Sequence, residues 1–235
     1  MAERARGQVE LTAEVRQFFA SVPYLAGLGE EVHAACVRAA RRREFARGAV
    51  VALEGEACPG LYFVESGWLK AVRSSPDGRE QVWAFFGPGE ALNHFDVFAG
   101  TPNLSTIVAL EDSSLFFVSR EALTRLLAEQ PSLAAAVIAH LAQHAVLLLS
   151  LVDDLSLRSV EERLAHFLLS ESDGDTVHRR RWLTQSELAA RLGTVPDVLN
   201  RALRSLSEQG LIAVDRHQIR LLDRQGLADR AEGYA

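Results

Sequence analysis

Cysteine is scarce in this sequence: Cys36 and Cys58 are the two cysteines among 235 residues. Two thiols are too few for a disulfide framework, and they cannot supply the four ligands of a four-cysteine metal cluster. Because neither kind of site can be built from two residues, we expect each cysteine to be an ordinary thiol.

Long hydrophobic runs are missing too. No apolar stretch is long enough to span a bilayer, and the opening residues, MAERARGQVE, lack the apolar segment of a signal peptide. We therefore expect a cytoplasmic protein without a membrane partner. The hydrophobic content of 48% still allows a substantial buried core, which we expect two domains to share.

Positive charge is in deficit overall, with a net charge of −6, but it is unevenly distributed. Between residues 179 and 224, nine arginines stand against five acidic residues. This asymmetry is typical of a basic DNA-reading module joined to an acidic regulatory one, and a charged solvated surface is the alternative.

The stretch 184–206 predicts two short helices joined by a tight corner. Thr184 begins the first helix with capping-box spacing, and Gly193 supplies the corner. Thr194 can cap the second helix, with Pro196 in its first turn. One face of the second helix is apolar, and another face carries Asp197, Asn200, Arg201 and Arg204. Because these side chains mix hydrogen-bond donors and acceptors, they suit a helix that reads the major groove of double-stranded DNA; a solvated helix face is the alternative.

The rest of the chain predicts an α+β protein. Residues 9–44 keep helical spacing, and the basic run Arg41–Arg43 makes a favourable helix end. From 45 to 118, short apolar runs alternate with glycine and proline turns, including a hairpin turn at 76–78. This rhythm is typical of an antiparallel β-sandwich or jelly-roll-like β-roll. Residues 132–157 predict one long apolar helix that needs a partner in water, and burial against the β-roll of the same chain is the alternative.

Shorter elements follow the same patterns. The run ALNHFDVFAG predicts a short helix, and residues 177–183 predict a strand. After Gly210, which ends the second short helix, LIAVDRHQIRLLD predicts a two-stranded hairpin, the wing of a winged helix. Residues 225–235 have no strong pattern, so we expect them to fray.

The ordered turn motifs resemble those of one protein family. The series Phe45-Ala-Arg-Gly48, Gly55, Leu61-Tyr62, Gly67, Leu69-Lys70, SPDGRE, GPGE and TIVALED is similar to the cyclic-nucleotide-binding roll of CRP/FNR transcription regulators. The resemblance covers nearly the whole chain. It implies a sensor β-roll domain with N-terminal helices at 1–131, a dimerisation helix at 132–157, and a winged helix-turn-helix DNA-binding domain at 158–235.

The resemblance also implies a homodimer on a palindromic DNA site, with RNA polymerase as a further partner if the protein is an activator. Relatives that recognise an FNR-type site carry Glu-x-x-Ser-Arg on the reading helix, where this chain has Asp197-Val-Leu-Asn200-Arg201. Pro196 resembles the same position in nitric-oxide-responsive, haem-dependent denitrification regulators. The remaining DNA-binding candidates are Thr184, Gln185, Arg204 and the run Arg179–Arg181, the last two for phosphate contact.

The resemblance argues against cyclic AMP as the effector. Relatives that bind cyclic AMP neutralise its phosphate with an arginine, and this chain has Asn103-Leu104-Ser105-Thr106 in that segment. We expect haem or a small hydrophobic effector instead, and ordinary core packing is the alternative. The candidate pocket residues are Trp83, Phe86, Leu92, Phe95, Leu104 and Leu148.

Three histidines are candidate haem ligands. His94 comes first, because it lies within one residue of the position where carbon-monoxide-sensing haem relatives place an iron ligand. His140 and His144 are the alternatives, one turn apart on the long helix. A hydrogen-bonded structural role competes with metal binding for all three.

Two other functions compete with a homodimeric transcription regulator. The first is a ligand-sensing module that signals through a protein partner without specific DNA binding, and the polar face of the reading helix argues against it. The second is a metal-dependent β-roll enzyme, which would need a clustered His-x-His, whereas residues 45–118 contain the single histidine His94. We therefore expect a regulator and not an enzyme.

Overall fold

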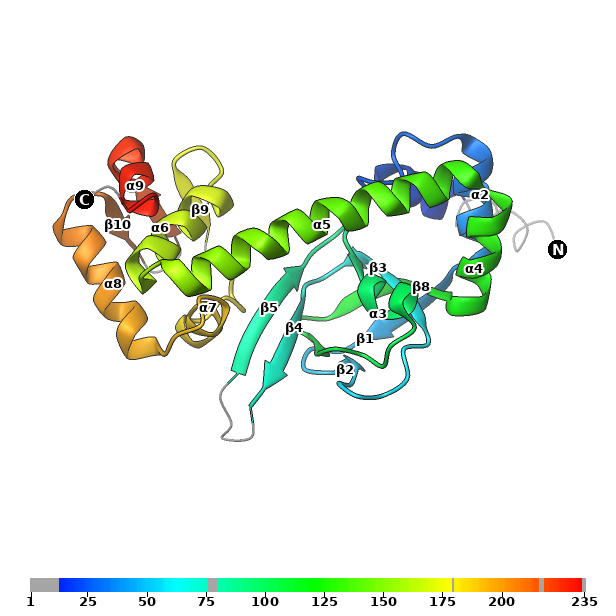
Figure 1. The fold of residues 1–235 in the computed structure, drawn as a ribbon, viewed down its shortest axis with the longest axis horizontal. Coiled ribbons are helices and arrows are strands. Elements are labelled where there is room, and N and C mark those ends of the chain that lie inside the picture. The colour runs from blue at the N-terminus through cyan, green and yellow to red at the C-terminus, as the bar shows by residue number, and fades with distance from the viewer. Residues whose placement is uncertain (1–12, 76–79, 179, 216–217, 234–235) are drawn as a thin grey trace. The chain divides into compact units, whose positions relative to one another are not determined.

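The computed structural model describes residues 13–75, 80–178, 180–215 and 218–233. The chain divides into two compact units, residues 1–73 with 83–145 and residues 74–82 with 146–235 (Figure 1). The hairpin turn predicted at 76–78 lies outside the described residues. Among the described helices, none combines the length and hydropathy that crossing a membrane requires.

Two four-stranded sheets form a β-roll. One has the strand order β1-β8-β3-β6, and the other has the order β2-β7-β4-β5. The strands are β1 (Arg41–Phe45), β2 (Val50–Ala52), β3 (Gly60–Ser66), β4 (Leu69–Ser74), β5 (Glu80–Phe86), β6 (Ala91–Leu92), β7 (Thr106–Ala109) and β8 (Ser113–Ser119). Strand β8 pairs antiparallel with β1 and β3, and β7 pairs antiparallel with β2 and β4. The predicted antiparallel β-roll is confirmed.

Helices cover one side of this roll. They are α2 (Glu30–Ala39), the short α3 (His94–Ala99), α4 (Arg120–Glu129) and α5 (Pro131–Leu157). Leu133 and Val137 of α5 are buried in the same apolar cluster as Phe19, Phe63 and Phe116. The long helix predicted at 132–157 is confirmed, and its first part packs on the roll of its own chain.

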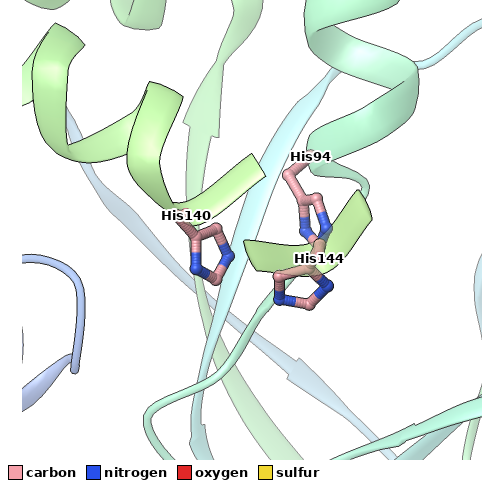
Figure 2. Close-up of side chains that lie close together, drawn as sticks. All are labelled: His94, His140 and His144. Carbon is pink, nitrogen blue, oxygen red and sulfur yellow. The ribbon is translucent and has the colours of Figure 1, made fainter. Parts of the chain in front are cut away.

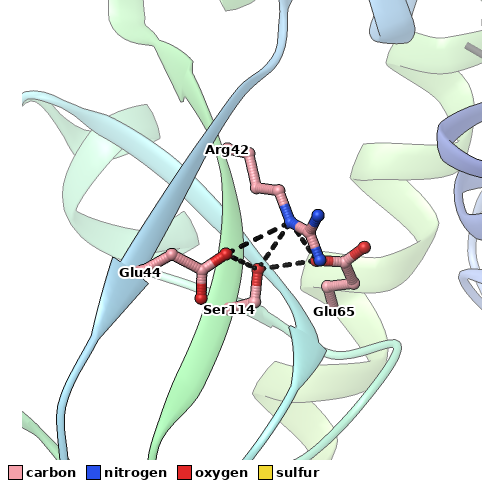
Figure 3. A network of polar contacts seen from close by, with 4 residues as sticks. All are labelled: Arg42, Glu44, Glu65 and Ser114. Atoms are coloured by element: carbon pink, nitrogen blue, oxygen red, sulfur yellow. Dashed lines mark hydrogen bonds and ion pairs between the residues drawn. The ribbon is translucent and has the colours of Figure 1, made fainter. Parts of the chain in front are cut away.

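The run Arg41–Arg43 is not a helix end but the beginning of strand β1, so that prediction is wrong. Arg42 Nε lies 2.8 Å from Glu65 Oε2 and 2.9 Å from Ser114 Oγ, and Glu44 completes the network (Figure 3). Partners on β1, β3 and β8 therefore satisfy the charge that a helix dipole was expected to stabilise. Ion pairs that remain partly exposed to solvent, as these are, each contribute about 0.2–1 kcal/mol.

The second unit contains a helix-turn-helix and a small winged sheet. Its elements after α5 are α6 (Val160–Glu171), β9 (Thr176–His178), α7 (Gln185–Arg191), α8 (Pro196–Glu208), β10 (Ile212–Val214), β11 (Gln218–Leu221) and α9 (Arg224–Ala231). The sheet order is β10-β11-β9, with antiparallel pairing throughout its described registers. The predicted wing is present, and β9 begins and ends earlier than the strand predicted at 177–183.

Two local predictions in this unit are wrong. The N-cap of α8 is Val195, without a side-chain hydrogen bond, instead of Thr194, while Pro196 does occupy the first helical position. Of the residues expected to fray, 225–231 belong to helix α9, at whose start Asp223 accepts a hydrogen bond from the Gly226 N–H at 2.9 Å. Leu227 is fully buried and fixes α9 to the core, which a polar eight-residue sequence does not reveal.

Candidate DNA-reading surface and histidine cluster

Helix α8 has one buried apolar face and one polar face. Its buried residues are Leu199, Ala202, Leu203 and Leu206. Asp197, Arg201 and Arg204 are exposed, and Asn200 is half-buried. Within the described part of the chain, none of these four polar side chains pairs with another residue. Their donors and acceptors are therefore available to an external ligand.

The corner before α8 is held by contacts from two other helices. Thr184 Oγ1 accepts a hydrogen bond from a backbone N–H in the first turn of α7, at 3.2 Å, as the capping pattern predicts. Gly193 adopts a φ of 64°, which favours glycine. Arg163 of α6 donates from Nε to the Leu192 carbonyl at 3.0 Å. The angle between α7 and α8 is thus set by the corner and by a neighbouring side chain.

The remaining DNA-binding candidates lie at the start of α7 and just before it. Thr184 and Gln185 are exposed there. Of the basic run Arg179–Arg181, Arg180 and Arg181 are exposed, and Arg179 lies outside the described residues. Exposed arginines supply the sequence-independent attraction of a protein for DNA phosphates.

Three histidines from two helices meet in the first unit (Figure 2). His94 is the first residue of α3, and His140 and His144 lie one turn apart on α5. One ligand nitrogen from each ring lies within 4.8 Å of those of the other two. The sequence offered these residues as alternatives, and the structure brings them together in one cluster.

Backbone contacts fix the direction of His94. Asn93, which precedes it, has a φ of 67° and is the one non-glycine residue with positive φ in the described chain. His94 Nδ1 lies 3.2 Å from the Ala91 carbonyl oxygen. Because a carbonyl only accepts, Nδ1 carries the proton and Nε2 presents its lone pair.

Two nitrogens of the cluster have no partner. Nε2 of His94 and Nε2 of His140 are buried, and neither forms a hydrogen bond within the described residues. An unsatisfied buried polar atom of this kind costs about 1–3 kcal/mol. Tyr24 stacks on the His140 ring, with 4.3 Å between ring centroids, and so holds that ring in place.

The cluster is kept uncharged. Burial lowers the pKa of His94 to about 3, with further lowering from His144 and then His140. Burial, and then His144, lowers the pKa of His140, and burial lowers the pKa of His144. At neutral pH the three imidazoles are therefore in the neutral form that can bind a metal.

The residues expected to line an effector pocket occupy different environments. Leu92 is fully buried in the core, whereas Trp83 is 36% exposed and Leu104 is 43% exposed. Phe86 and Phe95 are half-buried, and Leu148, in the second unit, is 48% exposed. Phe95 meets the His144 ring edge-on at 5.8 Å between centroids, so this member of the set borders the histidine cluster.

The segment without a phosphate-binding arginine is used structurally. Asn103 is buried, donates to the Leu53 carbonyl at 3.0 Å and accepts from Asn93 Nδ2 at 3.3 Å. The Leu104 N–H donates to the buried Asp96 carboxylate at 3.0 Å. A carboxylate beside this segment would repel a phosphate group. The sequence pattern did not indicate that Asp96 lies there.

Comparison with known proteins agrees with this arrangement. The cyclic nucleotide-binding domain family matches residues 42–130, and the Crp-like helix-turn-helix domain family matches residues 162–230. The chain belongs to the CRP/FNR family. Regulators of this family bind DNA and are usually dimers, and they are not enzymes.

Several CRP/FNR proteins are similar along most of the chain. The CRP-like cAMP-activated global transcriptional regulator of Mycobacterium tuberculosis is 28% identical, over 80% of this chain and 87% of that protein. The cyclic AMP receptor protein of Thermus thermophilus is also 28% identical, over 91% of this chain and 98% of that protein. The solved structure of FixK2 from Bradyrhizobium japonicum superposes on this chain with a TM-score of 0.71 and 23% sequence identity. The match covers 81% of this chain and 96% of FixK2, and it shows that the two share a fold.

Proposed function

We propose that this CRP/FNR protein is a homodimeric, sequence-specific transcription regulator that binds an FNR-like palindrome under the control of a small effector other than cyclic AMP. The polar face of α8 carries the proposal: Asp197, Asn200, Arg201 and Arg204 follow helical spacing opposite a buried apolar row. A regulator that reads chromosomal DNA works where the DNA is, so we place it in the cytoplasm, with RNA polymerase as a partner if it activates transcription.

Base reading is assigned to the N-terminal half of α8. A carboxylate such as Asp197 can accept from cytosine N4, and the fork of Arg201 fits O6 and N7 of guanine. Asn200 lies beside them with an amide that both donates and accepts. Arg204, one turn beyond Asn200, is assigned to a phosphate, as are the exposed arginines before α7.

Dimerisation is assigned to α5, as the sequence pattern proposed. Ile138, Val146, Leu148 and Leu149 are 48–68% exposed on this helix, although all four are large and apolar. Such a row needs a partner in water, and a second copy of α5 offers a matching row. Two-fold symmetry then gives two reading helices and a palindromic site.

An effector other than cyclic AMP is supported by the residues around Asn103. Two similar proteins are named for cyclic AMP, but here the segment 103–106 contains no cation, and the buried carboxylate of Asp96 binds the Leu104 N–H. An unpaired phosphate beside a carboxylate is strongly disfavoured. The nitric-oxide or haem-responsive subtype remains part of the effector hypothesis.

Fluorescence anisotropy with an FNR-type palindrome, at one stated salt concentration, tests the DNA-reading assignment. We expect Arg201→Ala to weaken specific binding by roughly 1–3 kcal/mol and to relax base preference, because it removes a base contact. Arg125→Ala removes an exposed arginine of α4 in the first unit and is the matched control.

Two results would contradict this assignment. Undiminished specific binding by Arg201→Ala would show that another element reads the bases. No specific binding by the wild-type protein to any member of a randomised palindrome library would favour the ligand-sensing module that signals through a protein partner.

A further inference from the structure

We propose that His94, His140 and His144 form a binding site for one divalent transition-metal ion of the Zn²⁺ class. The proposal concerns the first unit alone, and it holds whether or not the DNA-reading assignment is correct. It rests on three observations. The rings converge (Figure 2), two of their buried nitrogens have no partner among the described residues, and backbone contacts fix the loop that carries His94.

The spacing of the three residues suits a metal. His140 and His144 are four residues apart on one face of α5, the arrangement by which a single helix supplies two imidazole ligands. His94 adds the third from α3, at ring-centroid distances of 4.7 Å from His144 and 5.3 Å from His140. Two nitrogens bound to one tetrahedral Zn²⁺, at about 2.0–2.1 Å each, lie about 3.4 Å apart. The nitrogens here lie within 4.8 Å, so small side-chain rotations close the site.

The backbone around His94 already holds its ring in a direction that suits metal binding. The Ala91 carbonyl accepts from Nδ1, which directs the lone pair of Nε2 into the cluster. The left-handed backbone of Asn93 sets the start of α3, and its side chain is held by Asn103. A strained residue beside a buried nitrogen without a partner is typical of a ligand site.

The donor set selects the ligand. Three neutral nitrogens suit Zn²⁺, Cu²⁺, Fe²⁺ or Ni²⁺, whereas Mg²⁺ and Ca²⁺ prefer oxygen ligands. Neutral imidazoles need no proton release before they bind. Three protein ligands leave a fourth tetrahedral position open to water or to a small donor molecule.

A bare ion fits the cluster better than haem. Haem iron binds histidine along the axis of a flat macrocycle, which needs open space beside the ring that coordinates it. The rings of His140 and His144 lie 4.4 Å apart between centroids and occupy the space next to His94. One imidazole cannot take a haem here unless the other two leave.

The experiment is a Co²⁺ titration of the full-length chain, purified without a polyhistidine tag and followed by visible absorption. We expect one tetrahedral Co²⁺ per chain, displaced by Zn²⁺. His144→Ala removes a half-buried ligand, and we expect it to weaken Co²⁺ binding by more than roughly 100-fold. Losing a residue that only hydrogen-bonds to a metal ligand costs up to about 100-fold, and losing the ligand itself should cost more. His178→Gln changes an exposed histidine on β9 in the second unit and should bind like the wild type.

His94→Ala provides a second ligand variant, and circular dichroism of each variant establishes that it is folded. Zn²⁺ should raise the melting temperature of the wild type and of His178→Gln, but not of His144→Ala. Absent Co²⁺ absorption, or unchanged absorption in both ligand variants, would overturn the proposal. So would stoichiometric haemin binding that His94→Ala abolishes in a chain that binds no Co²⁺.

Discussion

Arg163 is a residue outside the helix-turn-helix that helps to hold its corner. Its guanidinium donates to the Leu192 carbonyl at 3.0 Å and to the Arg158 carbonyl at 2.7 Å. We expect Arg163→Leu to lower the free energy of unfolding by about 1–3 kcal/mol, because two carbonyls lose a charged donor.

Urea denaturation of the intact chain, followed by circular dichroism, measures this loss. Arg204→Leu is the control, because it changes an exposed arginine of α8 that pairs with no described residue. Equal midpoints for the wild type and Arg163→Leu would show that the corner does not depend on this contact.

The roles of single residues could be predicted where they depend on local patterns, and could not where they depend on distant partners. The exposed row of Asp197 and Arg201 follows from helical periodicity, since every residue that defines it lies within two turns. The N-cap at Val195 was placed one residue away, because Thr194 has a capping side chain and the corner does not use it. The Asp96 carboxylate against the Leu104 N–H depends on a loop path that no spacing encodes.

Helix α5 is an element with two unlike faces. Leu133 and Val137 are buried against the roll, whereas Ile138 is 68% exposed and Leu149 is 67% exposed. Ile138 and Leu149 are eleven residues apart, which is close to three full turns, so they share one side of the helix. An apolar pair of this kind on an exposed side is typical of a helix that pairs with a second copy.

The double variant Ile138→Glu with Leu149→Glu tests that pairing. We expect it to be monomeric in sedimentation velocity, because like charges would face each other across the two-fold axis. Gln143→Glu adds a charge to an exposed position about 140° around the helix and should leave the dimer intact. A dimeric double variant would place the interface elsewhere.

Strongly periodic elements could be predicted, and elements fixed by tertiary pairing could not. The bounds of α5 differ from the prediction by one residue, because its apolar pattern persists over many turns. Strand β1 was missed because Arg41–Arg43 is polar, and it becomes a strand through its register with β8. Helix α9 was missed because only two of its residues, Leu227 and Ala231, are buried, which gives no clear apolar pattern.

Along the chain, α5 connects the cyclic nucleotide-binding-like β-roll to the Crp-like helix-turn-helix. The same helix supplies His140 and His144 to the histidine cluster and carries the exposed apolar row. His94 is 46 residues from His140 along the chain, so their meeting depends on how α3 folds back onto α5. Sequence spacing identified the three histidines as candidates, but the folded chain was needed to make them one site.

A metal bound by this cluster would link α3 to α5 and so restrict the helix that is assigned to dimerisation. We therefore expect saturating Zn²⁺ to change the dissociation constant for the DNA palindrome by about 5- to 150-fold, the usual range of coupling between two sites. Because coupling is reciprocal, DNA should change the affinity for Zn²⁺, measured by displacement of Co²⁺, by the same factor in the same direction. Anisotropy and Co²⁺ absorption measure the two factors, and His144→Ala should abolish both while His178→Gln keeps them. Tight Co²⁺ binding without any change in DNA affinity would make the metal site structural. Loss of DNA binding in Arg201→Ala together with normal Co²⁺ binding would show that the DNA-reading surface can be lost while the metal site is kept.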